Sequence, residues 1–315
     1  MMNPASLIKH INDGGQQLSD GDLMGAHATY HSTLATIGDL LDELANSPQR
    51  RTRAYSPTPS ADQNACPSGQ DVMDALHCTY LPNHDLRPRR LCVNIFTIHP
   101  SYSASLTAWS PWEEMVFLKT LFQIIMFNIA LLHHVQAAQI LHDYAAQQCT
   151  SKQTTKGAQE ESWDAPGTDL YEAEQDVDPN PVCIQLLQQS IDLYRGALAL
   201  SVATPSRGDC QPEWQTLSGP GPSHPNATPL ITSSLNNLMD INLMLGRRNE
   251  AHCCLEKLFI AVLHFEKLNT GVPSASSSIQ AEHVVCDRCD NVHELFWCNI
   301  SELLWEHKPC TAPCA

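Results

Sequence analysis

The stretch LNNLMDINLMLGRRNEAHCCLEKL, residues 235–258, decides the fold. From Ala251 to Phe265, apolar residues recur at steps of 4, 3, 4 and 3, which is the spacing of one face of a helix. Gly246 precedes this run, and glycine can adopt the positive φ that ends a helix. Asn249 can cap the helix that follows. The stretch therefore predicts two helices joined at Gly246.

The same spacing of residues occurs near the start of the chain. In residues 235–258 the template is Met239, Gly246, Ala251, Leu255 and Leu258, at steps of 7, 5, 4 and 3. The steps are identical in INDGGQQLSDGDLMGAHATYHSTL from Ile11, where the template residues are Gly14, Gly21, Ala26, Tyr30 and Thr33. Asp20 is the candidate cap of the second helix here. Two distant segments thus predict the same unit.

Two further copies are incomplete. One has Ala130 at the first position and, after a long insertion, keeps the last steps of 4 and 3; its final positions are Ser190, Tyr194 and Ala197. The other begins at His293 and has Ser301 at the first position. A single helix pair leaves one apolar face exposed to water, so several units must stack to form a continuous core.

This pattern resembles the tetratricopeptide repeat, a pair of antiparallel helices with small residues where they cross and a glycine at the turn. The resemblance rests on the two segments quoted above and on FNIALLHH from Phe127 joined to LLQQSIDLYRGAL from Leu186. Met239 departs from it, because it replaces the usual small residue, and the usual aromatic residue at the start of the first helix is absent.

The resemblance implies a mainly α protein, an irregular α-solenoid of about three and a half helix pairs in a single domain, residues 1–315. The pairs are expected at about 5–45, 114–146 with 182–202, 229–268 and, in part, 291–307. The alternative is an irregular helical bundle with the same periodicity. A short, partly β-branched run at residues 91–98 predicts one strand or extended arm.

Four segments are expected to be disordered or loop insertions, at about 47–70, 147–181, 205–229 and 270–281. Three of them are rich in Pro, Ser, Thr, Gly, Gln or acids, and such segments bury too little apolar surface to offset the cost of ordering. Long insertions are tolerable, because each doubling of a flexible loop costs only ~0.6 kcal/mol.

Charge and cysteine content exclude several classes of protein. With 18 basic and 34 acidic residues the net charge is −16, so nucleic acid and acidic membranes are not expected as partners. Thirteen cysteines, an odd number, argue against a disulfide framework and for a reducing compartment. The start of the chain lacks a secretory pattern. We therefore expect a cytoplasmic or nuclear protein that is not secreted.

The most apolar window, residues 116–135, is long enough to cross a bilayer as a helix. Lys119, Gln123 and Asn128 interrupt it, and His133 and His134 close it. Each polar group would need a partner in hydrocarbon. This window is therefore predicted to be a helix buried between other helices, and no membrane is expected as a partner.

An asparagine stands two residues before the first position of every unit: Asn12, Asn128, Asn237 and Asn299. In the fold that this chain resembles, the first helix of each pair lines the concave face. These amides could therefore offer donors and acceptors to an extended peptide backbone. The alternative is that each asparagine only bonds a neighbouring helix. On the first interpretation, the four asparagines bind another protein or an extended peptide.

A second candidate site lies near the C-terminus, where Cys286, Cys289, His293 and Cys298 form C-x2-C-x3-H-x4-C. These are four soft ligands of the kind that tetrahedral zinc favours, although ordinary buried thiols are the simpler interpretation. No cofactor is otherwise expected. His133 and His134 point about 100° apart on a helix, so they cannot readily share a metal ion.

No H-E-x-x-H, G-x-S-x-G or P-loop pattern is present, so no catalytic residue is predicted. The function we expect is a non-enzymatic scaffold that binds a peptide or protein through the concave face of the helical repeat. Three alternatives remain open: a C-terminal zinc-binding interaction module, an enzyme whose site is not legible from sequence, and a helical domain that only stabilises a larger assembly.

Overall fold

The structure is a computed structural model, and it describes residues 4–46, 76–80, 91, 94–99, 111–155, 180–202, 228–270, 296 and 299–300. These residues are mainly helical, as the sequence predicts, and the helices pack against one another. The helices and strands are α1 (Pro4–Ser19), α2 (Leu23–Asn46), β1 (Leu76–Tyr80), β2 (Asn94–Ile98), α5 (Pro111–Thr155), α6 (Pro181–Val202), α7 (Thr228–Met244) and α8 (Arg248–Thr270).

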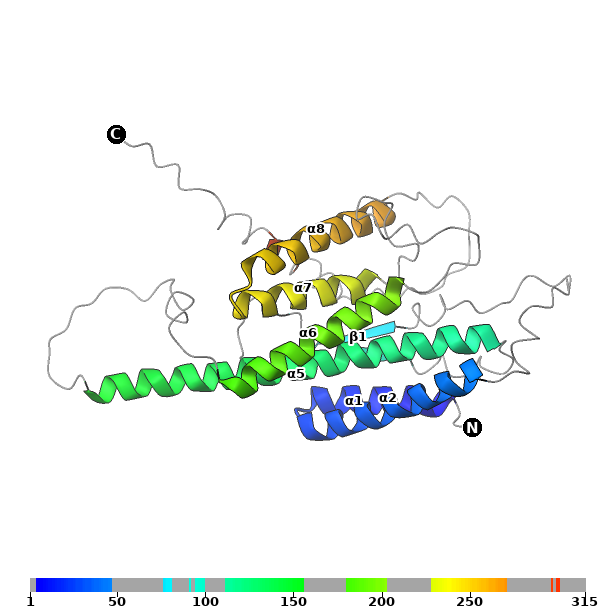
Figure 1. The fold of residues 1–315 in the computed structure, drawn as a ribbon, viewed down its shortest axis with the longest axis horizontal. Coiled ribbons are helices and arrows are strands. Elements are labelled where there is room, and N and C mark those ends of the chain that lie inside the picture. Colours follow the sequence, from blue (N-terminus) through cyan, green and yellow to red (C-terminus); the bar gives the residue numbers. More distant parts are fainter. Residues whose placement is uncertain are drawn as a thin grey trace, which may run out of the picture.

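Each helix contacts the next one along the chain. The order of contacts runs from α1 to α2, then to α5, α6, α7 and α8, and Figure 1 shows this succession across the molecule. In addition, α5 contacts both α1 and α7. The first helices of successive predicted pairs therefore lie against one another. The division of the chain into these pairs stays a prediction.

The two short turns, after α1 and after α7, have the same geometry. Gly21 has φ +81° and Gly246 has φ +67°, a region that disfavours side chains. At each turn the glycine N–H donates to the carbonyl three residues earlier, and the next N–H donates to the carbonyl five residues earlier. Each pair of bonds satisfies carbonyls that a helix end leaves without partners.

The helix caps differ from the sequence prediction. Asp22 caps α2, because its Oδ1 accepts a hydrogen bond from the N–H of Gly25 at 2.9 Å. Asp20 lies two residues before Asp22 and instead accepts a bond from Gln16. Asn249 lies inside α8, which begins at Arg248. Both predicted caps are wrong, because each helix begins at a residue other than the predicted one.

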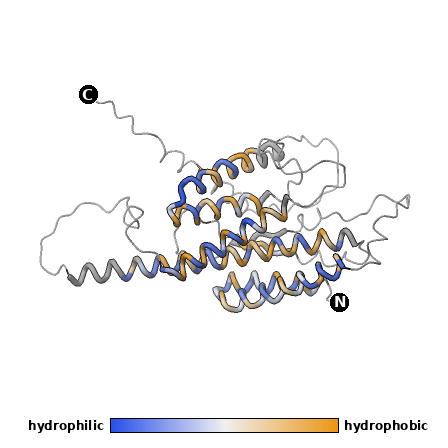
Figure 2. The backbone as a smooth tube through the Cα atoms, in the orientation of Figure 1, coloured by the Kyte–Doolittle hydropathy of each residue, from blue (hydrophilic) through white to orange (hydrophobic). Residues whose placement is uncertain are grey.

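Helix α5 is the centre of the core. It contains a stretch, Glu114–Tyr144, that is long and apolar enough to cross a membrane, but 78% of the most apolar window there is buried inside the protein. Figure 2 shows hydrophobic residues along α5 where it runs between the α1–α2 pair and helices α6 and α7. This burial is the arrangement that the polar residues of the window favour.

Close helix packing occurs where the template places a small residue. A Cβ added at Gly14 would lie 2.7 Å from Cε1 of Tyr30, so the ring of Tyr30 rests directly on the backbone of α1. Tyr30 is fully buried there. The glycine therefore lets α1 and α2 approach closely.

Strand β2 falls within the predicted extended run 91–98, and it pairs antiparallel with β1. Strand β1 was not predicted, although its five residues, LHCTY, alternate between apolar and polar side chains. In the paired register, Ile98 faces Leu76 and Asn94 faces Tyr80. Ile95, Phe96 and Ile98 are buried in the main core.

The C-terminal part of the chain is described only in part. Phe296 and Ile300 are buried in a second apolar cluster with residues of α7 and α8, such as Leu255. Helix α5 continues to Thr155, so the insertion expected at 147–181 is helical over its first residues. The insertion at 47–70 lies outside the described residues, as do most of those at 147–181 and 205–229 and the part of 270–281 beyond Thr270.

Candidate functional site: asparagine side chains that hold an extended strand

Asn12, on α1, forms a two-point hydrogen bond with the backbone of β2. Its Nδ2 donates to the carbonyl of Ile98 at 2.7 Å, and its Oδ1 accepts the N–H of Ile98 at 2.9 Å. A side-chain amide carries the same donor and acceptor as a peptide group, so it can satisfy both groups of one strand residue. These two residues are separated by 86 positions in the chain.

Asn128, on α5, holds β2 in the same way two residues earlier. Its Oδ1 accepts the N–H of Phe96 at 3.1 Å, and its Nδ2 donates to the carbonyl of Phe96 at 2.8 Å. The same Nδ2 also donates to the hydroxyl of Tyr30 at 3.2 Å. Asn128 is fully buried, and its three bonds join α5 to both β2 and α2.

The phenol of Tyr30 stays neutral in this setting. Burial raises its pKa far above the ordinary value, and the hydrogen bond from Asn128 opposes that shift only in part. A neutral hydroxyl can accept the bond from Asn128 without placing a charge in the core. The asparagine, the tyrosine and the strand therefore form an uncharged network.

The two asparagines complete one edge of the small sheet. Phe96 and Ile98 are alternate residues, so their N–H and C=O groups point to the same edge of β2. The groups of Ile95 and Thr97 then point to the other edge, toward β1. Asn12 and Asn128 thus occupy the place of a neighbouring strand, and the face of the first helices holds an extended backbone.

The next asparagine repeats the bond to a tyrosine. Nδ2 of Asn237, on α7, donates to the hydroxyl of Tyr194, on α6, at 2.9 Å. Tyr194 is the template equivalent of Tyr30, and Asn237 is the equivalent of Asn128. The bond between the second helix of one predicted pair and the first helix of the next is therefore repeated, with side chains 43 positions apart here and 98 positions apart in the first case.

The last asparagine is bonded differently. Nδ2 of Asn299 donates to Oδ1 of Asn236 at 2.7 Å, and Nδ2 of Asn236 contacts Oδ1 of Asn237 at 3.3 Å. The template position that holds a tyrosine in the earlier units is Leu255, which has no hydroxyl. The amides of Asn237 and Asn299 are both buried, and they belong to a network with other side chains.

His133 and His134 face different parts of the molecule. Nε2 of His134 lies 3.2 Å from Oδ2 of Asp240 on α7, without the alignment of a hydrogen bond. His133 instead faces His27 and His31 on α2. The sequence did not reveal this second group, because His133 lies more than 100 positions from His27 and His31. The spacing of four between His27 and His31 was the available signal.

The predicted zinc ligands Cys286, Cys289, His293 and Cys298 lie outside the described residues. Among the described residues, the asparagines of α1 and α5 form the site with the clearest chemistry, recognition of an extended backbone without charge. Comparison with protein-family models, curated proteins and solved structures finds no match to this chain.

Proposed function

We propose that this chain is a non-enzymatic interaction scaffold that binds an extended segment of a protein partner at the strand pair held on the face of its first helices. The observation that carries this proposal is the pair of two-point bonds from Asn12 and Asn128 to alternate residues of β2. These bonds use only the N–H and C=O groups of the strand, so the face can hold an extended backbone whatever its side chains are. The chain is proposed to act in the cytoplasm or the nucleus.

The scaffold is proposed to be an irregular α-solenoid of tetratricopeptide-like helix pairs. Three features support this interpretation: the contact of each helix with the next, the two like turns at Gly21 and Gly246, and the repeated bond between a tyrosine and an asparagine. In such an arrangement, distant parts of the chain contribute to one surface.

The partner is proposed to pair with β1 rather than to replace β2. Displacing β2 would expose Ile95, Phe96 and Ile98, and each fully buried side chain of this size contributes about 1.5–3 kcal/mol. The asparagines are therefore positioning residues that fix β2, and β2 in turn fixes β1. A partner strand that pairs with β1 needs no such displacement.

The outer edge of β1 has the geometry that strand addition requires. Because Ile95 and Thr97 bond toward β1, their partners Thr79 and His77 point their backbone groups toward β2. The N–H and C=O groups of Leu76, Cys78 and Tyr80 then point away from β2. No strand among the described residues pairs with that edge. A partner would add a third strand there.

A selection from displayed, unstructured peptides tests this mode of binding. Peptides selected on the wild-type protein are measured on Cys78→Pro and on its matched control Cys78→Ala. Proline removes the outward N–H of residue 78, and an edge strand tolerates it where that N–H is not used within the sheet. We expect binding to weaken at least tenfold for Cys78→Pro and to stay the same for Cys78→Ala.

Two results would contradict the proposal. One is undiminished binding to Cys78→Pro, with its helical spectrum and melting temperature unchanged. The other is a bound peptide whose isotope-edited infrared spectrum is helical, since strand addition requires an extended peptide.

A further inference from the structure

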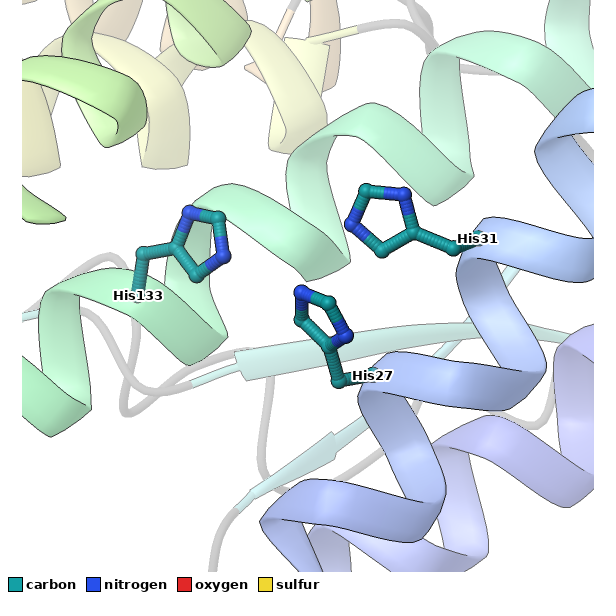
Figure 3. A group of neighbouring side chains, drawn as sticks. All are labelled: His27, His31 and His133. Carbon is teal, nitrogen blue, oxygen red and sulfur yellow. The ribbon is translucent and has the colours of Figure 1, made fainter.

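Three histidines from two helices converge beside the contact between α2 and α5. His27 and His31 are one turn apart on α2, so they lie on the same face of that helix. Their ring centroids are 4.2 Å apart, and the centroid of His27 is 5.6 Å from that of His133 on α5. Figure 3 shows the three rings directed toward a common space between the helices.

The distances are close to those of a metal site. One ring nitrogen from each histidine lies within 4.8 Å of the others. Ligands of a tetrahedral zinc ion, at 2.0–2.1 Å from the metal, are about 3.3 Å apart. The distances between the nitrogens therefore have to shorten by about 1.5 Å at most. Rotation of the side chains is the movement that this requires.

The surroundings of His133 and His31 favour the neutral form of these two rings, which is the form that binds metal. Burial, followed by the neighbouring His27 and His31, lowers the pKa of His133 from 6.5 to about 4. Burial and His27 also lower the pKa of His31. Only a neutral imidazole has a free lone pair for a metal ion. At neutral pH, His133 and His31 are therefore ready donors.

His133 also has an unsatisfied buried atom. Its side chain is 7% exposed, and its Nδ1 has no hydrogen-bond partner in the part of the chain that the structure describes. Buried polar atoms normally have partners, so each exception needs an explanation. A metal ion bound through Nδ1 would satisfy this atom, whereas a metal ion bound through Nε2 would fix the ring and leave Nδ1 without a partner.

We infer that His27, His31 and His133 form a binding site for a divalent transition-metal ion, with zinc as the ion that the three imidazoles suit best. Imidazole nitrogens favour Zn²⁺, Cu²⁺ and Ni²⁺ over Mg²⁺ or Ca²⁺. His31 is exposed and His27 is half-buried, so an ion can enter from solvent. Three protein ligands leave a fourth position for water.

The ion would join α2 to α5 at a point separate from the bonds of Asn128. The site is also distinct from the predicted cluster at Cys286, because it contains no sulfur. This inference does not depend on the proposed binding of a partner. Its expected consequence is a folded state that is stabilised by metal.

Cobalt spectroscopy on the metal-free, full-length protein tests the site. Co²⁺ in a four-coordinate site absorbs visible light strongly, and a bond to cysteine adds a separate charge-transfer band in the ultraviolet. We expect a visible band without charge transfer, saturating at one equivalent and abolished by added Zn²⁺. The band should be lost in His31→Ala and in His133→Gln.

His252→Ala is the matched control, because His252 is an exposed histidine on α8 that faces Glu256 instead of other histidines. It should keep both the band and the rise in melting temperature that Zn²⁺ causes in the wild type. His31→Ala should lose that rise, and because His31 is exposed, its removal should leave the metal-free melting temperature unchanged. An equal metal response in wild type and His31→Ala, or no visible band at all, would overturn the inference.

Discussion

Asn128 and Asn237 occupy the same position in the template, but their surroundings differ. Asn128 bonds Tyr30 and both backbone groups of Phe96, so its amide reaches two other elements. Asn237 bonds the equivalent tyrosine, Tyr194, and its oxygen lies near Asn236. Among the described residues, the amide of Asn128 thus reaches a strand of its own chain, whereas the amide of Asn237 reaches side chains.

The difference shows that asparagine at one template position forms two kinds of bond. The bond to tyrosine links neighbouring helices and occurs in both regions. The two-point bond to a backbone occurs where an extended segment reaches the asparagine. Among the described residues, Asn128 and Asn237 therefore link neighbouring helices, and Asn12 and Asn128 hold a strand.

Asn128→Ala is expected to change the free energy of unfolding more than any other substitution that distinguishes the two regions. This change leaves the N–H and C=O of Phe96 and the hydroxyl of Tyr30 without their partner, and each buried unsatisfied group costs about 1–3 kcal/mol. We expect the free energy of unfolding to fall by about 3–5 kcal/mol in chemical denaturation. A loss below about 1 kcal/mol would show that β2 is not held by this side chain.

The sequence predicted the turns and the asparagine column, because both depend on local patterns. Gly21 and Gly246 were recognisable from their place after a helical stretch, and they adopt the positive φ that the turn requires. The spacing of Asn12 and Asn128 from the small residues predicted amides that could bind an extended backbone. Local spacing therefore carried information about chemistry as well as about helices.

The identity of the bound backbone was not legible from the sequence. Ile98 is 86 positions from Asn12, and no local pattern links them. Strand β1 was missed because its alternation covers only five residues and its pairing partner lies elsewhere in the chain. His133 joins His27 and His31 only because α2 packs on α5. Features that form where two distant segments meet could be identified only from the structure.

Leu255→Ala tests the C-terminal region at the position that holds tyrosine in the other units. Leu255 is 6% exposed in the second apolar cluster. Truncating a buried leucine removes apolar contacts and leaves a cavity, so we expect a loss of about 2–4 kcal/mol in the free energy of unfolding. Leu263→Ala, at an exposed site on the same helix, is the control and should change it by less than about 0.5 kcal/mol.

Asn237→Ala is expected to lower the free energy of unfolding by about 1–3 kcal/mol, because its described bonds are to the side chains of Tyr194 and Asn236. A double-mutant cycle with Tyr194→Phe measures the bond itself. We expect a coupling of about 1 kcal/mol between the two changes. Strict additivity would mean that the bond between α6 and α7 contributes nothing to stability, and the parallel with Tyr30 and Asn128 would then fail.

The smallest expected effect concerns pH, and it arises at the border between the regions, where His133 faces α2 and His134 faces α7. The pKa of His133 is about 4 in the folded protein and 6.5 in an unfolded chain, so between these values the unfolded state binds more protons. The free energy of unfolding therefore falls as the pH falls from 6.5 to about 4. Water reaches the neighbouring rings of His27 and His31, and this limits the loss to about 1–2 kcal/mol.

Chemical denaturation of the metal-free protein at several pH values measures this loss, and His133→Gln isolates the contribution of His133 from those of other titrating groups. The difference between wild type and variant should change over pH 4 to 6.5 and stay constant above that range. If both proteins lose stability in parallel, the packing of α2 on α5 does not lower the pKa of His133. Because burial is the main cause of the lowered pKa, a parallel loss would also mean that His133 is open to water, and the close approach of these two helices would have to be revised.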